Sequence, residues 1–188
     1  MDDIAFSTSC YSLWNWHMNH RIRLLLLGMM TLFSFAPAAL AAQRVAVFDF
    51  ELIDTSLDGE TYGARPEEKA RLKKVSDQLR QALAKSGQFE VVDIGPVDAA
   101  AHEANLQACG GCDAALARKL GADLSITGTV QKVSNLILNM NFYIRDVSSQ
   151  RLIASRSADF RSNTDESWTR TMNYLIRNYL LAPNFGGN

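Results

Sequence analysis

Apolar and polar residues alternate along three successive segments in the second half of the chain. From 124 to 130 every second residue is Leu, Ile, Gly or Val, with Ser, Thr and Thr between them. The segments 136–145 and 152–160 continue this alternation. A period of two is that of a β-strand. Because short turns at 132–135 and 146–150 separate the segments, the pattern predicts an antiparallel meander of three strands.

The second face of this predicted meander carries Ser, Thr, Asn and Gln side chains. Such a face either meets solvent or forms a binding surface. We expect solvent, which is the ordinary neighbour of the polar face of an antiparallel sheet.

A long amphipathic helix is predicted over 66–86. Pro66 stands at the first helical position, acidic residues follow in the first turn, and Gly87 suits the position after the last turn. Apolar residues recur at spacings of three and four along it, which predicts one buried stripe. That stripe consists of Leu72, Val75, Leu79 and Leu83.

Predicted strands flank this helix. The sequence RVAVFDF at 44–50 is largely apolar on both faces, as in a strand covered on both sides. FEVVDI at 89–94 is a second short strand, closed by Gly95-Pro96. Together they predict a βαβ unit, whose crossover is normally right-handed.

Shorter helices complete the predicted elements. Segments 97–108 and 114–120 are helical, and Gly121 caps the second. The sequence NTDE at 163–166 is an N-cap signature with acids in the first turn, and an apolar stripe follows it. The stripe consists of Trp168, Met172, Leu175, Ile176 and Tyr179. The chain is therefore expected to be an α/β domain with a mixed sheet: a βαβ unit, short helices, a three-stranded antiparallel meander and a C-terminal covering helix.

Residues 1–41 have the features of a secretory signal peptide. An uncharged run at 24–35 follows Arg21 and Arg23 and leads into the sequence APAALA. A basic start, a short apolar core and a small-x-small end predict cleavage after Ala41. An uncleaved inner-membrane anchor is the alternative, since 24–42 is uncharged and could just span a bilayer.

The first 17 residues fit this signal badly. Asp2 and Asp3 place acids where a signal peptide has bases, so we expect the true start near Met18 and treat 1–17 as a mis-assigned extension. Residues 42–188 then form a single periplasmic domain, which contacts the membrane only through the transient signal peptide. The chain as a whole has a formal charge of −1, which favours neither nucleic acid nor an anionic membrane as partner.

Two groups of side chains could hold a cation. The segment 51–64 carries Glu51, Asp54, Asp58 and Glu60 among turn formers, but it lacks the spacing of an EF-hand loop, so a solvated acidic loop is expected. His102 is the only histidine after residue 41. Because neither a cysteine nor a second histidine lies in helical register with it, zinc binding is a weak interpretation and no metal or cofactor is predicted.

The most conspicuous motif is Cys109-Gly-Gly-Cys112, followed by Asp113. A c-type haem would need histidine at 113. In an oxidising compartment the two thiols are expected to form a structural disulfide, worth about 2 kcal/mol for so small a ring. A redox-active dithiol is the alternative, since Cys112 begins a helix whose dipole lowers a thiol pKa. A metal site is a third reading.

The sequences VAVFDF at 45–50 and LGADLSITGTV at 120–130 resemble small envelope domains, namely the TolB amino-terminal domain and the curli-secretion protein CsgG. The chain, with its CGGC and the NTDESW at 163–168, also resembles a family of secreted bacterial proteins of uncharacterised function. The resemblance covers about 44–181 and implies an exported α/β domain. It implies no activity, because TolB's propeller and the pore-forming hairpins and lipidated cysteine of CsgG have no counterpart here.

Two functional classes remain open from the sequence. The first, which we favour, is a non-enzymatic accessory module of the envelope that acts through a protein partner. The second is a periplasmic thiol-disulfide oxidoreductase that uses Cys109 and Cys112. Hydrolase chemistry is disfavoured, because there is no Gly-x-Ser-x-Gly motif and no catalytic residue is predicted.

Overall fold

The computed structural model describes residues 42–182. The predicted signal peptide, its cleavage site and the start near Met18 lie outside the described residues. Among the described helices, none is both long enough and apolar enough to cross a membrane.

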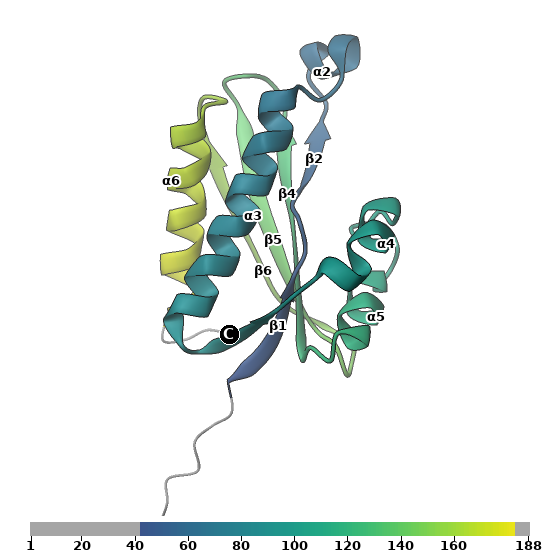
Figure 1. The fold of residues 1–188 in the computed structure, drawn as a ribbon. Helices are drawn as coiled ribbons and strands as arrows, with labels where there is room; N and C mark the ends of the chain where they lie inside the picture. Colours follow the sequence, from purple (N-terminus) through teal and green to yellow (C-terminus); the bar gives the residue numbers. More distant parts are fainter. Residues whose placement is uncertain (1–41, 183–188) are drawn as a thin grey trace, which may run out of the picture. The chain divides into compact units, whose positions relative to one another are not determined.

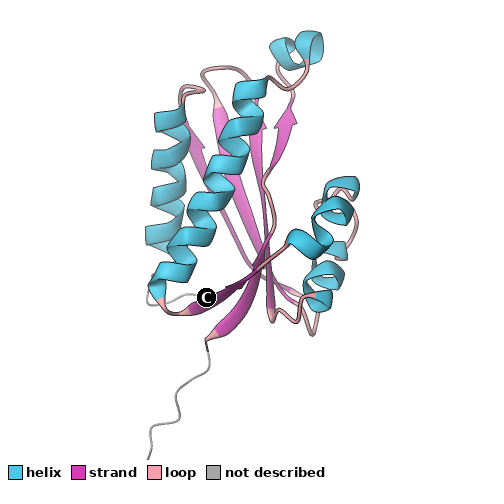
Figure 2. Ribbon diagram, viewed as in Figure 1, coloured by secondary structure: helices cyan, strands magenta, loops and turns pink. Residues whose placement is uncertain are grey.

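A mixed sheet runs through the domain in the order β3-β1-β4-β5-β6 (Figures 1 and 2). The strands are β1 (Gln43–Val47), β2 (Glu51–Asp54), β3 (Phe89–Val92), β4 (Leu124–Lys132), β5 (Leu138–Asp146) and β6 (Leu152–Phe160). Strand β1 is parallel to both β3 and β4, and β2 is parallel to the second half of β4. Strands β4, β5 and β6 are antiparallel. The predicted βαβ unit, meander and mixed α/β fold are confirmed.

One face of the sheet is covered by the two longest helices, α3 (Pro66–Ser86) and α6 (Asp165–Leu175) (Figure 1). The predicted stripe of α3 packs into a core with alternate residues of β4 and β5 and with Trp168. The α6 helix begins as predicted, because Thr164 Oγ1 accepts a hydrogen bond from the backbone N–H of Ser167. The helix continues into a π-helical turn, η2 (Ile176–Leu180).

The opposite face is covered near β1 and the start of β4 by two short helices, α4 (Asp98–Glu103) and α5 (Cys112–Lys119) (Figure 1). Ala46 and Phe48 meet them in a second, smaller core. A 3-10 turn, η1 (Gly95–Val97), leads into α4. The predicted helix over 97–108 is therefore shorter than expected, since α4 ends at Glu103 and turns fill the rest.

The face predicted to meet solvent is partly buried. Ser125, Thr127 and Thr129 of β4 are 4% exposed or less. Ser125 Oγ donates to Asp113 of α5 at 2.6 Å, so a polar contact between helix and sheet explains the polar residue. Asp113 also accepts from the guanidinium of Arg145 on β5. The prediction of a solvent-facing β4 was wrong, because the pattern of one strand does not reveal what covers it.

The acidic segment after the first strand is also more ordered than predicted. The first strand stops at Val47, and the chain resumes pairing with β4 as β2, followed by a short helix, α2 (Leu57–Tyr62). The side chain of Asp54 is only 9% exposed, whereas a solvated carboxylate was expected. Lys132, expected in a turn, is the last residue of β4 and is fully buried.

Candidate functional site

The predicted cysteine pair lies between α4 and α5. The sulfur atoms of Cys109 and Cys112 are placed at bonding distance, with Cα atoms 5.7 Å apart. Cys109 is exposed and Cys112, at the start of α5, is half-buried beside the smaller core. This geometry suits a disulfide that fixes the beginning of α5, and the disulfide itself stays a prediction.

A buried cation stands at the far end of β4. The ammonium of Lys132 donates to Glu68 at 2.7 Å, to Asp54 at 3.0 Å and to Asp58 at 3.4 Å. Lys132 side-chain exposure is 0%, and that of Glu68 is 1%. Because an unpaired charge in such a place would be costly, these four side chains form one interdependent unit, which we call the Lys132 cluster.

Further hydrogen bonds tie this cluster to α6. Asn163 Nδ2 donates to Glu68 at 2.7 Å, while its Oδ1 accepts from the indole N–H of Trp168 and from Arg71. Burial alone would raise the pKa of Glu68, but the bonds from Lys132, the Arg65 N–H and Asn163 hold that pKa below its usual value. Five elements (β2, α2, α3, β4 and the start of α6) are therefore joined at one end of the sheet.

An apolar surface lies at the same end. Six large apolar side chains there are between 42% and 79% exposed: Ile53, Leu57, Tyr62, Val133, Leu136 and Ile137. They come from β2, from α2 and from the turn between β4 and β5 (Figure 1). A backbone hydrogen bond joins the β2–α2 segment to the end of β4, since the N–H of Thr55 donates to Lys132 O at 2.9 Å. We call these six residues the tip surface.

The surroundings of the tip surface are acidic. Five carboxylates stand in or beside it; Arg65 and Lys132 pair with three of them, and the other two have no ion pair among the described contacts. The carboxylates are Asp54, Asp58, Glu60, Glu67 and Glu68. Glu60 and Glu67 are exposed.

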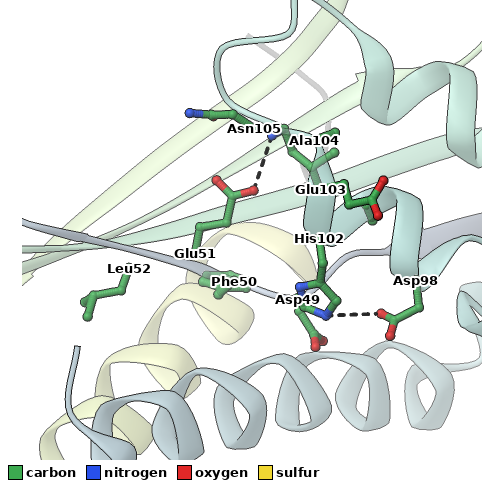
Figure 3. Close-up of a pocket in the computed structure, with 11 residues that line it drawn as sticks. Asp49, Phe50, Glu51, Leu52, Asp98, His102, Glu103, Ala104 and Asn105 are labelled. Carbon is green, nitrogen blue, oxygen red and sulfur yellow. Dashed lines mark hydrogen bonds and ion pairs between the residues drawn. The ribbon is translucent and has the colours of Figure 1, made fainter. Parts of the chain in front are cut away.

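A second candidate site is a cavity of about 340 Å³ at the carboxyl end of β1, between that end and α4 (Figure 3). Strand β1 lies between β3 and β4 in the sheet. The connection from β1 to β3 places α3 on one face of the sheet, and the connection from β3 to β4 places α4 and α5 on the opposite face. In open α/β sheets, ligands bind in the crevice at such a reversal of strand order. We call this cavity the switch-point pocket.

Its lining combines carboxylates with one imidazole. Asp49, Asp98 and His102 offer ligand atoms within 4.8 Å of one another. Glu51 lines the same pocket, where burial raises the pKa of its carboxyl, and it accepts a hydrogen bond from the N–H of Leu106 at 3.3 Å (Figure 3). Among the residues that the structure describes, the polar lining consists of carboxylates, one imidazole and one amide, which are donors suited to a cation.

Sequence reasoning missed most of these residues. Lys132 looked like a turn residue, and nothing local indicates that three carboxylates from distant segments surround it. Asp98, however, stands four residues before His102, which is helical register for two side chains on one face. This spacing of a carboxylate and an imidazole is the one local signal in the sequence that indicates the pair.

The fold resembles solved structures at low sequence identity. The LpoB C-terminal domain from Salmonella enterica is 17% identical, with 74% of this chain and 95% of that chain covered and a TM-score of 0.48. The lipoprotein GNA1162 from Neisseria meningitidis is 14% identical, with 71% and 92% covered and a TM-score of 0.45. TolB from Acinetobacter baumannii is 13% identical, with 73% of this chain but 28% of that chain covered and a TM-score of 0.37. At such identities the likeness concerns the fold alone.

Sequence comparison gives the family. No curated protein matches the chain. The family model DUF3280, described as "Protein of unknown function (DUF2380)", matches residues 43–180, in agreement with the resemblance to a family of uncharacterised function. The match covers nearly the whole described domain, and the chain therefore belongs to this family.

Proposed function

We propose that the chain is an exported accessory module of the bacterial envelope, related to the TolB amino-terminal and CsgG-like domains, which acts in the periplasm by binding a protein partner through its tip surface. The observation that carries the proposal is the gathering of six exposed large apolar side chains at one end of the sheet. Single exposed apolar residues are ordinary on a protein surface, whereas grouped ones mark interaction sites.

The tip surface is prepared for binding by the structure beneath it. Strand β2, α2 and the β4–β5 turn are joined by the Lys132 cluster and by the Thr55–Lys132 backbone bond. Asn163 N–H donates to Asn135 O at 2.9 Å, which fixes the turn against the start of α6. A surface held in this way loses little conformational entropy when a partner binds, so more of the apolar burial appears as affinity.

The local charge indicates the chemistry of the partner. An apolar centre with uncompensated carboxylates beside it is complementary to an apolar protein surface flanked by Lys or Arg. We therefore propose a partner protein that presents apolar side chains with basic neighbours. Location in the periplasm rests on the signal peptide predicted for residues 1–41.

The thiol oxidoreductase remains the second candidate. Its support is the place of Cys112 at the first turn of α5 together with the exposure of Cys109. A measured reduction potential in the range of glutaredoxins or protein disulfide isomerase would favour it, whereas a much lower one would indicate a structural disulfide.

Site-specific photocrosslinking in the native host tests the proposal. A photoreactive residue at Leu136 or Tyr62 should give one discrete adduct, and the same residue at Lys73 or Arg177, exposed elsewhere, should not. The adduct at Leu136 should disappear when Tyr62→Asp is added. Equal adducts from all four positions, or none from the tip, would refute the proposed surface.

A further inference from the structure

We propose that the switch-point pocket binds a divalent first-row transition metal ion, for which zinc is the test ion, through Asp49, Asp98 and His102. This inference does not depend on the proposed function. It rests on the donor atoms, their positions and the charge of the cavity.

The three donors come from two rigid parts of the fold. Asp98 and His102 lie one helical turn apart on α4, with His102 Nε2 3.5 Å from Asp98 Oδ1. Asp49 follows the end of β1 and faces them across the pocket (Figure 3). In a tetrahedral zinc site with bonds of about 2.0–2.1 Å, ligand atoms lie about 3.4 Å apart. The histidine–aspartate pair already has about that separation, and Asp49 offers an oxygen within 4.8 Å of both, so a side-chain adjustment of Asp49 completes the site.

Neighbouring groups orient and charge the site. The guanidinium of Arg80 donates to Asp49 Oδ1 and to Val47 O, which holds the carboxylate in place and leaves its second oxygen available. Glu51 and Glu103 add two carboxylates to the lining. Arg80 pairs with Asp49, and Lys73 lines the adjoining cleft beside Asp49 and Asp98. Four carboxylates against these two cations leave the pocket with an excess of negative charge even before His102 is considered.

A second observation points to a ligand in the cavity. Glu51 is half-buried, and its carboxylate receives a hydrogen bond from the backbone N–H of Leu106 but no ion pair among the described contacts. A carboxylate partly removed from water and aimed into a cavity favours a cation there.

The donor types select the class of metal. Magnesium and calcium favour sites made of oxygen alone, whereas an imidazole nitrogen beside carboxylates suits zinc and its first-row neighbours. Three protein ligands leave one position for water or for a group from another molecule. The nearby guanidinium opposes the metal charge, so we expect binding in the micromolar range and not the tightness of a structural zinc finger.

Isothermal titration with zinc chloride alone tests the inference. The purified, tag-free protein, stripped with chelator, should bind one equivalent. Asp98→Asn and His102→Ala should each weaken binding at least tenfold and keep the circular dichroism spectrum of the unchanged protein. Asp93→Asn, at the end of β3 and outside the donor set, is the matched control and should bind like the unchanged protein.

Two titration results would overturn the inference. One is the absence of binding at millimolar zinc. The other is equal affinity in His102→Ala and the unchanged protein, which would place the ion elsewhere. X-ray absorption at the zinc edge gives an independent readout, and a first shell without imidazole nitrogen would also contradict the site.

Discussion

Replacing Lys132 by methionine removes the buried ammonium while keeping an unbranched side chain of similar length. Glu68 and Asp54, whose side chains are 1% and 9% exposed, would then face each other without a cation. Removing one partner of a buried ion pair costs about 3–5 kcal/mol. Glu68 keeps two donors, the Arg65 N–H at 3.0 Å and Asn163 at 2.7 Å, so we expect a loss of about 3 kcal/mol at pH 7.

The assay is thermal unfolding followed by circular dichroism. For a domain of this size, about 3 kcal/mol lowers the Tm by roughly 6–12 °C. Lys73→Met is the matched control, because Lys73 forms an exposed ion pair with Asp77 and its removal should leave the Tm nearly unchanged.

The pH dependence of the difference in Tm between the unchanged protein and Lys132→Met is a second test. The folded pKa values of Asp54 and Glu68 are lowered, so their contribution is complete above the unfolded pKa of about 4 and is lost as the pH falls through the folded values. In Lys132→Met, acid protonates the same two carboxyls and makes them neutral, so the missing cation no longer lowers stability. The gap in Tm between the two proteins should therefore narrow from pH 7 toward pH 3. A variant that melts within about 2 °C of the unchanged protein at pH 7, or a gap that widens in acid, would refute the reasoning.

Three other changes test separate parts of the fold. Gly128→Ala should lower stability by about 1–3 kcal/mol, measured by urea unfolding, because an added Cβ would collide with the ring of Phe50; an unchanged midpoint would contradict that packing. Cys109→Ser should cost about 2 kcal/mol or less in nonreducing buffer and nothing in the presence of dithiothreitol, and a loss that persists under reduction would mean that the thiol itself, not a bond to Cys112, matters. Thr164→Ala removes the N-cap of α6 and should cost about 1 kcal/mol, with Thr164→Ser restoring stability; failure of serine to restore it would place the effect outside the cap.

Local patterns were sufficient for the long elements. Helix α3 has the predicted bounds, because a proline start, a 3-4 apolar spacing and a left-handed Gly87 at φ 69° all act within a few residues. The meander strands follow from period two, and the cap of α6 follows from its threonine. In each case the determinant lies in the element itself.

The candidate site could not be predicted in the same way, because its determinants lie far apart in the chain. Lys132 meets Asp54 and Glu68 across 78 and 64 residues. Its environment depends on the pairing of β2 with β4, and β2 is only four residues long in a segment rich in turn formers. Ser125 appeared to be a solvent residue since its partner, Asp113, belongs to another element. Polar residues indicate a need for partners, and only the tertiary fold shows whether water or protein supplies them.

Binding through the tip surface is tested by the mass of the material captured with the protein from an extract of the host. Leu136→Glu places a charge on the tip, whereas Ile153→Glu changes an exposed apolar residue on β6, outside the tip. Native mass spectrometry after affinity capture should show a complex heavier than the single chain for the unchanged protein and for Ile153→Glu, and the free chain for Leu136→Glu. A complex that persists in Leu136→Glu, or an unchanged protein found only as the free chain, would contradict binding through the tip surface.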